Sequence, residues 1–324
     1  MKIVFCGNDT GMLGDELIPG GQTQRYLQSV FTALDEAGAD YEVRRNPVGG
    51  ALNVYTNNRE TYPSQSQLRD GYSVHVSHGL ASKGYRDHSK TRTYRYMFVP
   101  GDLQYREVIR SGRPARKLEV AGYPKLDPLF SRRELEYAPD SSRVRVLYAP
   151  THGGGGEKYK EGNRNAPGAR ATSYWRRDEV LQALLEAGFE VVESLHPRHS
   201  PGHKATFDEY VTADVVVADG GSTLYEAGVL GIPVVSPTWM VGERNLERGG
   251  RSRRTLESEY YYQRIGYHVE EPSSFTDTIL EAVENGQDDK TVEFMEGIVP
   301  SSLRGTSGER WAHRLMEIAG GDRV

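Results

Sequence analysis

Short apolar runs alternate with longer amphipathic stretches along most of the chain. The apolar runs are rich in β-branched side chains and too short for helices, which is typical of buried parallel strands. They predict strands at residues 2–5, 40–44, 72–77, 94–99, 117–127 (with a Gly-x-Pro turn), 144–150, 190–194, 215–218 and 234–235.

The amphipathic stretches repeat apolar side chains with the period of a helix. They predict helices at residues 23–34, 102–111, 175–187, 224–230, 274–284 and 307–318. Residues 46–69 are polar, show no clear period and receive no predicted element. Strands that alternate with helices predict an α/β protein built on Rossmann-like parallel sheets.

The length of the chain predicts two such domains, because 324 residues exceed the size at which one hydrophobic core stays single. The charged segment 131–143, which contains Pro139, is the predicted linker. We therefore expect an N-terminal domain at residues 1–135 and a C-terminal domain at residues 143–305. A final helix at 306–324 is expected to pack back on the N-terminal domain.

The clearest candidate site lies between Ala213 and Pro237. Five consecutive residues follow its predicted strand: Asp219, Gly220, Gly221, Ser222 and Thr223. The two glycines permit a tight turn, and either hydroxyl residue is a natural N-cap for the next helix. Backbone N–H groups and hydroxyls at a helix N-terminus favour a phosphate, and Glu226, one turn further on, is well placed for a ribose diol. The alternative is that Ser222 only caps the helix and that Glu226 is a solvated carboxylate.

Histidines follow two of the predicted strands, at the edge where open α/β sheets bind their ligands. His78 leaves the strand at 72–77, and His196 leaves the strand at 190–194. An imidazole there could act as a general base at neutral pH, and the alternative for His78 is a structural role with hydrogen bonds to the backbone. Cations that would suit an anionic substrate, or only solvent, lie nearby: Lys83, Arg86 and Arg198.

A glycine-rich loop at residues 153–172 follows the strand at 144–150. Its four consecutive glycines lack the Gly-Lys-Ser/Thr ending of a P-loop, so we interpret it as a lid or an acceptor loop. His196, His199 and His203 lie close in sequence, but no pattern of carboxylates accompanies them. We therefore predict no metal site.

Composition narrows the functional classes. No apolar run approaches the roughly 20 residues of a membrane span, and the first residues lack the features of a signal peptide, so we expect a cytoplasmic protein that begins at Met1. Cys6 is the only cysteine, which excludes an intrachain disulfide and a cysteine-built metal site. The net charge of −5 argues against nonspecific polyanion binding, although residues 164–177 and 248–254 form local basic patches.

Several short motifs occur in the order and spacing of one known family. They are His78-Gly79 with Lys83, Gly122-Tyr123-Pro124-Lys125 with Asp127, Tyr148-Ala149-Pro150-Thr151, His196-Pro197, and Asp219-Gly220-Gly221-Ser222-Thr223 with Glu226. Over roughly residues 72–240, the chain resembles the CDP-glycerol glycerophosphotransferases, which build teichoic acids and related capsular polymers. The resemblance implies a GT-B fold, in which two Rossmann-like domains, one on the acceptor side and one that binds the nucleotide donor, face a cleft.

The resemblance also implies roles for these residues. His78 would take the proton of the acceptor hydroxyl, and His196 would stabilise or protonate the pyrophosphate. The implied donor-binding set is Thr151, Asp219, Gly220, Gly221, Ser222, Thr223 and Glu226. The secondary set for the substrate anion is Lys83, Arg86 and Arg198. Neither a metal nor a cofactor other than the nucleotide-activated donor is implied.

The chain departs from the family at two places. The family usually has Asp-Tyr-Ser-Ser where this chain has two glycines after Asp219, and it has an aromatic residue where Ser77 precedes His78. The glycine pair looks more like the nucleotide-sugar GT-B enzymes and the UDP-N-acetylglucosamine 2-epimerases.

The predicted function is transfer from a nucleotide-activated donor to a hydroxyl, most specifically glycerophosphate from CDP-glycerol to a polyol or glycan polymer. The expected partners are this donor and a hydroxyl-bearing polymer acceptor. One alternative is a UDP-sugar glycosyltransferase that acts on a glycan, a protein or a modified nucleic acid. Another is a 2-epimerase, and the non-enzymatic alternative is a nucleotide-binding regulatory module.

Overall fold

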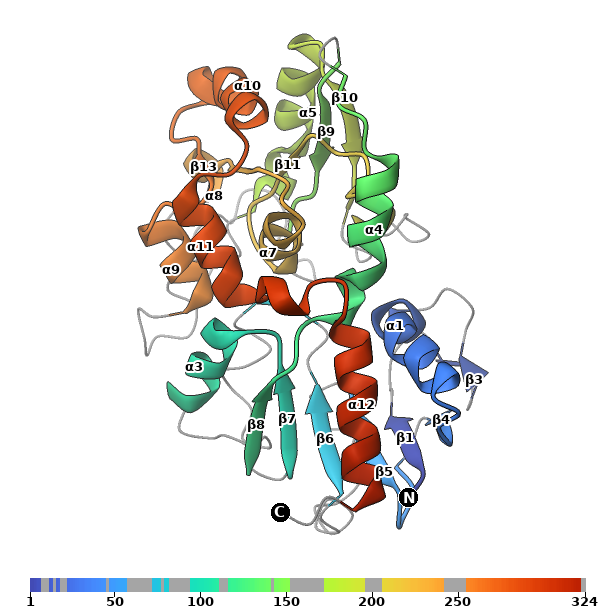
Figure 1. Cartoon of the computed structure of the whole chain (residues 1–324). Helices are drawn as coiled ribbons and strands as arrows, with labels where there is room; N and C mark the ends of the chain where they lie inside the picture. The colour runs from blue at the N-terminus through green and yellow to red at the C-terminus, as the bar shows by residue number, and fades with distance from the viewer. Residues whose placement is uncertain are drawn as a thin grey trace. The chain divides into compact units, whose positions relative to one another are not determined.

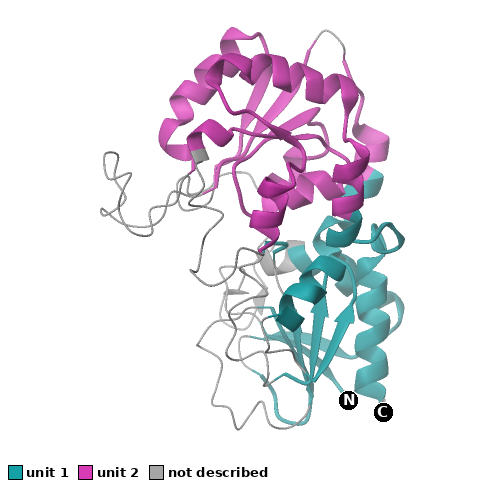
Figure 2. Ribbon diagram, turned by 90° about the vertical axis from the view of Figure 1, so that its left-hand side faces the viewer, with its two compact units in different colours: residues 1–131, 296–324 teal, residues 132–295 magenta. Residues whose placement is uncertain are grey.

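The chain forms two compact units, residues 1–131 with 296–324 and residues 132–295 (Figure 2). Each unit is built on one parallel sheet, so the predicted pair of Rossmann-like parallel sheets is confirmed. This computed structural model describes residues 1–6, 12–13, 16–17, 22–44, 47–56, 72–76, 79–81, 94–110, 116–140, 143–151, 172–195, 206–241 and 255–321.

The first unit contains a six-stranded parallel sheet with the order β4-β1-β5-β6-β7-β8 (Figure 1). Its strands are β1 (Ile3–Cys6), β4 (Tyr41–Arg44), β5 (Leu52–Tyr55), β6 (Ser73–Val76), β7 (Tyr96–Val99) and β8 (Lys117–Val120). In register, Val54 of β5 lies between Phe5 of β1 and Val74 of β6. A separate antiparallel pair is formed by β2 (Met12–Leu13) and β3 (Glu16–Leu17).

Strand β5 lies within residues 46–69, where the sequence predicted no element. All four of its residues are buried, and one of them is polar. The side chain of Asn53 accepts a hydrogen bond from the N–H of Val48 at 2.9 Å and donates to the carbonyl of Val48 at 3.0 Å. A buried amide is tolerated when its partners are inside the protein, and the apolar period is lost because this residue interrupts it.

Helices cover both faces of the first sheet. Alternate residues of β1 point to opposite faces: the ring of Phe5 meets Phe31 of α1 (Gln22–Glu36) at 5.1 Å, whereas Val4 shares a cluster with Val108 of α3 (Asp102–Arg110). Helix α12 (Ser307–Gly320) packs beside α1 (Figure 1). Its buried Trp311 completes the α1 face of the sheet, where it meets Phe98 of β7 at 5.7 Å.

A buried carboxylate fixes the start of α12. The N–H groups of Gly308 and Ser307 donate to Asp127 at 2.6 and 3.3 Å, and the N–H of Tyr123 donates to the Ser307 hydroxyl at 2.9 Å. A Cβ at Gly122, where φ is +83°, would lie 2.1 Å from that hydroxyl, so only glycine fits. The Gly-Tyr-Pro-Lys-Leu-Asp segment, which includes η3 (Pro124–Leu126), therefore anchors the C-terminal helix.

The chain passes between the units within two helices, α4 (Asp127–Glu136) and α11 (Asp289–Ile298). The second unit therefore runs from 132 to 295 rather than from 143 to 305, and the predicted linker at 131–143 is partly helical. Charge and Pro139 made this segment resemble a linker, but Arg132 and Glu136 pair one turn apart at 3.0 Å, an arrangement that supports a helix. The segment with η8 (Ser301–Leu303) and α12 belongs to the first unit.

The second unit contains a five-stranded parallel sheet with the order β10-β9-β11-β12-β13. Its strands are β9 (Arg145–Tyr148), β10 (Glu190–Glu193), β11 (Val215–Val217), β12 (Val234–Ser236) and β13 (Tyr267–His268). Its further helices are η5 (Ser173–Arg176), α5 (Arg177–Glu186), α6 (Thr206–Glu209), α7 (Ser222–Val229), α8 (Thr238–Val241), α9 (Leu256–Tyr262), η7 (Pro272–Ser274) and α10 (Phe275–Asn285).

Valines make up half of the buried core cluster on one face of this sheet, where Val215 and Val217 of β11 pack with Val180 of α5 and Ile279 of α10. The sequence did not predict α9, α11 or β13.

In the described parts of the chain, no helix combines the length and apolar character needed to cross a bilayer.

The buried Asp127 carboxyl predicts a pH-dependent stability. Burial raises the pKa of Asp127 from 3.8 to about 6, against the hydrogen bonds that lower it. The folded state therefore binds this proton more tightly than the unfolded state. The contribution of this proton to the stability of the folded state is complete below pH 3.8 and is lost as the pH rises through about 6. Relative to Asp127→Asn, the wild-type free energy of unfolding should fall by about 3 kcal/mol across this window.

Urea unfolding at a series of pH values measures this difference. Trp311 reports on the first unit when Trp175 and Trp239 are replaced by Phe in both proteins. Asparagine does not titrate. Any change with pH in the difference between the two free energies of unfolding therefore belongs to Asp127 or to residues coupled to it. A difference that rises with pH would mean that the helix N–H groups outweigh burial.

Candidate functional site

The second sheet reverses its winding between β9 and β11. From β9 the chain continues to β10 on one side, and it then returns to β11 on the other side of β9. Open α/β sheets bind ligands outside the carboxyl ends of the strands at such a switch point. Thr151 follows β9 and Asp219 follows β11, so two of the predicted site residues lie there.

The turn after β11 depends on one glycine. Gly221 is the N-cap of α7, with φ 75° and ψ −165°, a region of backbone conformation that is essentially restricted to glycine. Gly220 has no positive φ, and a Cβ there would meet Thr151 Cγ2 at an ordinary 3.7 Å. The prediction that Ser222 or Thr223 caps the helix is wrong, because both lie inside α7 and the cap makes no side-chain hydrogen bond.

Asp219 is fully buried and is surrounded by hydrogen-bond donors. Its Oδ1 accepts from the N–H of Thr151 at 2.7 Å. Its Oδ2 accepts from the hydroxyl of Thr172 at 2.9 Å, and from the N–H and hydroxyl of Ser173 at 2.5 and 2.7 Å. Burial raises the pKa of Asp219 above its ordinary value, although these four bonds lower it. These bonds tie the carboxylate to the segment that follows β9 and to the residues at the start of η5, which gives it a structural function at the turn.

The same network extends to two further side chains. The phenol of Tyr148 donates to the Ser173 hydroxyl at 3.0 Å, and the Thr172 hydroxyl also lies 2.7 Å from the carbonyl of Thr151. Residues 151 and 172 are thus joined to each other and to Asp219. They stand at either side of residues 152–171, which lie outside the described part of the chain.

A tyrosine fixes the backbone of the turn. The phenol of Tyr261 donates to the carbonyl of Asp219 at 2.9 Å. Among the three adjacent tyrosines, Tyr260 and Tyr261 are buried, whereas Tyr262 is 57% exposed. Two of these three side chains therefore pack inside the second unit.

Glu226 lies on the second turn of α7 and is 3% exposed, so the alternative of a solvated carboxylate is wrong. The phenol of Tyr210 donates to Glu226 Oε2 at 3.2 Å. The side chain of Thr223 lies beside the same phenol.

The other predicted site residues lie outside the described part of the chain. They are His78, Lys83, Arg86, His196 and Arg198. Their roles, and that of the loop at residues 153–172 beyond its last residue, stay predictions. The segment that carries His196 is bounded by Ser194 and Thr206, whose hydroxyls hydrogen-bond at 2.8 Å.

The sequence analysis missed the residues that support the turn: Tyr148, Thr172, Ser173, Tyr210 and Tyr261. Thr172 gave one local signal, because threonine is a preferred N-cap residue. In the structure its side chain caps η5 by accepting a hydrogen bond from the N–H of Tyr174 at 3.1 Å. Its contact with Asp219 joins residues 47 positions apart and has no sequence signature.

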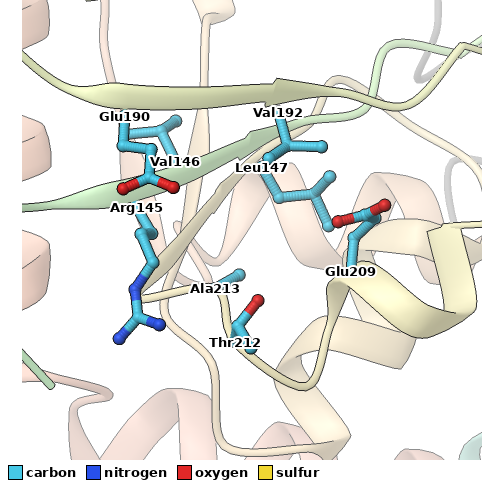
Figure 3. Close-up of a pocket in the computed structure, with 8 residues that line it drawn as sticks. All are labelled: Arg145, Val146, Leu147, Glu190, Val192, Glu209, Thr212 and Ala213. Atoms are coloured by element: carbon cyan, nitrogen blue, oxygen red, sulfur yellow. The ribbon is translucent and has the colours of Figure 1, made fainter. Parts of the chain in front are cut away.

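A small cavity lies at the opposite, amino-terminal edge of this sheet (Figure 3). Its volume of about 40 Å³ suits on the order of one water molecule. Arg145 and Glu190, the first residues of β9 and β10, line it. Among the described residues, no group of three or more His, Cys, Asp and Glu side chains could hold a metal ion.

Comparison with known proteins identifies the fold. No protein-family model matches the sequence, and no curated protein matches it. A histidine-to-alanine variant of the wall teichoic acid polymerase TagF matches with a TM-score of 0.63 and 12% identity, over 98% of this chain and 89% of that chain. A histidine-to-asparagine variant of TagF soaked with CDPG matches with a TM-score of 0.60 and 12% identity, over the same shares.

A proposed UDP-N-acetylglucosamine 2-epimerase from Listeria monocytogenes matches with a TM-score of 0.51 and 11% identity, over 100% of this chain and 98% of that chain. At such low identities these similarities show the fold alone. The chain therefore shares the GT-B fold of these proteins, and the resemblance to the glycerophosphotransferases is confirmed at the level of the fold.

The two glycines of the turn are predicted to respond differently to substitution. Gly221→Ala places a Cβ in a backbone region that only glycine occupies, so it should lower the free energy of unfolding of the second unit by about 1–3 kcal/mol. Gly220→Ala is the matched control and should stay within about 0.5 kcal/mol of the wild type. Urea unfolding followed by circular dichroism measures both. Equal effects would show that the turn does not require glycine at position 221.

Proposed function

We propose that this protein is a transferase that moves a group from a nucleotide-activated donor to an acceptor hydroxyl. The most specific form of the proposal is transfer of glycerophosphate from CDP-glycerol to a polyol or glycan polymer. The observation that carries it is the glycine turn at the switch point of a GT-B fold, where Gly221 opens α7.

The start of α7 supplies the chemistry that a nucleotide phosphate needs. The first N–H groups of a helix have no partner within the helix, and the helix dipole adds a partial positive charge there. Thr151 lies beside this turn, since its Oγ1 is 3.7 Å from the place where a Cβ of Gly221 would be. Hydrogen bonds of Asp219 and Tyr261 fix the backbone of the turn, so the N–H groups are oriented before a ligand binds.

The choice of CDP-glycerol is supported by two observations. Motifs of the glycerophosphotransferases occur in the same order along residues 72–240, and TagF gives the TM-score of 0.63 reported above. In this proposal His78 takes the proton of the acceptor hydroxyl, and His196 assists departure of the nucleotide.

One observation favours a UDP-sugar donor instead. Gly221 has a conformation that excludes other residues, so the turn cannot be reproduced by the Asp-Tyr-Ser-Ser sequence usual in glycerophosphotransferases, which places serine at this position. Gly220, by contrast, leaves room for a side chain. The difference at position 221 is therefore the one that bears on the donor.

A nucleotide panel separates the two donors. Thermal shifts with CDP, UDP, GDP and ADP report binding, because a ligand of the folded state raises its apparent stability. Preference for CDP supports the glycerophosphotransferase, preference for UDP supports the UDP-sugar enzyme, and no shift with any nucleotide contradicts the proposed function.

Activity tests the transferase directly. Incubation with CDP-glycerol and a polyol-phosphate acceptor should release CDP, and His78→Ala should reduce this release by at least about 100-fold, the usual contribution of a general base. His313→Ala is the control, because this histidine is 69% exposed on α12 and lies outside the predicted site. Release by wild type no greater than by His78→Ala would count against the proposal.

A further inference from the structure

Tyr210 is held rigidly between α6 and β11. Its side chain is fully buried. The guanidinium of Arg133 donates to the carbonyls of Tyr210 at 2.8 Å and Ala213 at 2.9 Å, and it lies 4.0 Å from the centre of the Tyr137 ring. Both the ring and the backbone of Tyr210 are thus fixed by the protein.

The phenol of Tyr210 contacts one face of α7. It donates to Glu226 Oε2 at 3.2 Å and lies beside the side chain of Thr223, since positions three apart on a helix are neighbours on one face. A fixed phenol that donates to the carboxylate sets the direction of Glu226.

The protonation of this phenol suits that task. Burial and the neighbouring Glu226 raise the pKa of Tyr210 well above its ordinary value, so it stays a donor at physiological pH. A hydrogen bond to an ionised acceptor is stronger than one between neutral groups. A carboxylate accepts several hydrogen bonds in all, so the bond from Tyr210 orients the group and leaves acceptor capacity for a diol.

We propose that Tyr210 is the positioning residue that gives this site its selectivity for ribonucleotides over deoxyribonucleotides. It acts through Glu226, whose carboxylate it aims at the ribose diol of the bound nucleotide. The inference rests on the proposed function, because it requires a nucleotide at the start of α7.

Tyr210→Phe tests this role, because it removes the hydroxyl and keeps the ring. The dissociation constants of CDP, 2′-deoxy-CDP and 3′-deoxy-CDP are measured by calorimetry with the full chain, or those of the UDP series if UDP binds more tightly. The wild type should prefer the ribonucleotide by about tenfold or more over at least one deoxy form. Tyr210→Phe should weaken ribonucleotide binding by about tenfold and leave that deoxy form unchanged, so the preference disappears.

Tyr267→Phe is the matched control. It removes another tyrosine hydroxyl of the same unit, one that donates to the carbonyl of Gly286 at 2.8 Å, and it should keep the wild-type preference. If Tyr210→Phe does not fold, Glu226→Gln weakens the same bond from the other side, because it replaces the ionised acceptor of the Tyr210 phenol by a neutral amide. This variant should also reduce the preference.

The outcomes separate this inference from the proposed function. Equal weakening of both nucleotide forms by Tyr210→Phe would assign Tyr210 a structural role only and overturn the inference. A wild type that binds both forms equally would also overturn it, while the proposed function would stand. A wild type that binds neither nucleotide series would overturn both.

Discussion

The geometry of the candidate site depends on one buried carboxylate. Asp219 has no contact with solvent, yet its two oxygens accept from Thr151, Thr172 and Ser173. Loss of such a group would leave several buried donors without an acceptor, which costs about 1–3 kcal/mol for each of them. The carboxylate therefore fixes the turn after β11 together with the segments that follow β9 and precede η5.

Helix α7 is short and is supported at both ends. An isolated helix of this length is unstable in water. Its first residues are fixed through Asp219 and Tyr261, and at its far end the amide of Gln287 donates to the carbonyls of Gly228 and Ile232 at 2.9 and 3.0 Å. The helix is thus held in place by tertiary contacts, which suits a site that must be formed before its ligand binds.

Local signals made the framework predictable. The apolar run of β11 lies next to the two glycines in the sequence. Together they predicted the strand, the turn and the next helix. The partners of Asp219 could not be found in this way, because a hydroxyl residue has the same appearance whether it faces solvent or a carboxylate 46 residues away. Strand β5 was missed for a related reason, since the buried hydrogen bonds of Asn53 are visible only in the folded chain.

The anchoring of α12 by Asp127 has a consequence for folding during synthesis. The ribosome completes the whole second unit, residues 132–295, before it makes the segment that carries Trp311. Until then the nascent first unit exposes the apolar surface that this tryptophan covers, beside Tyr26 and Phe98. The second unit is therefore expected to fold first, as a contiguous insert, and the first unit to close around its own C-terminal helix afterwards.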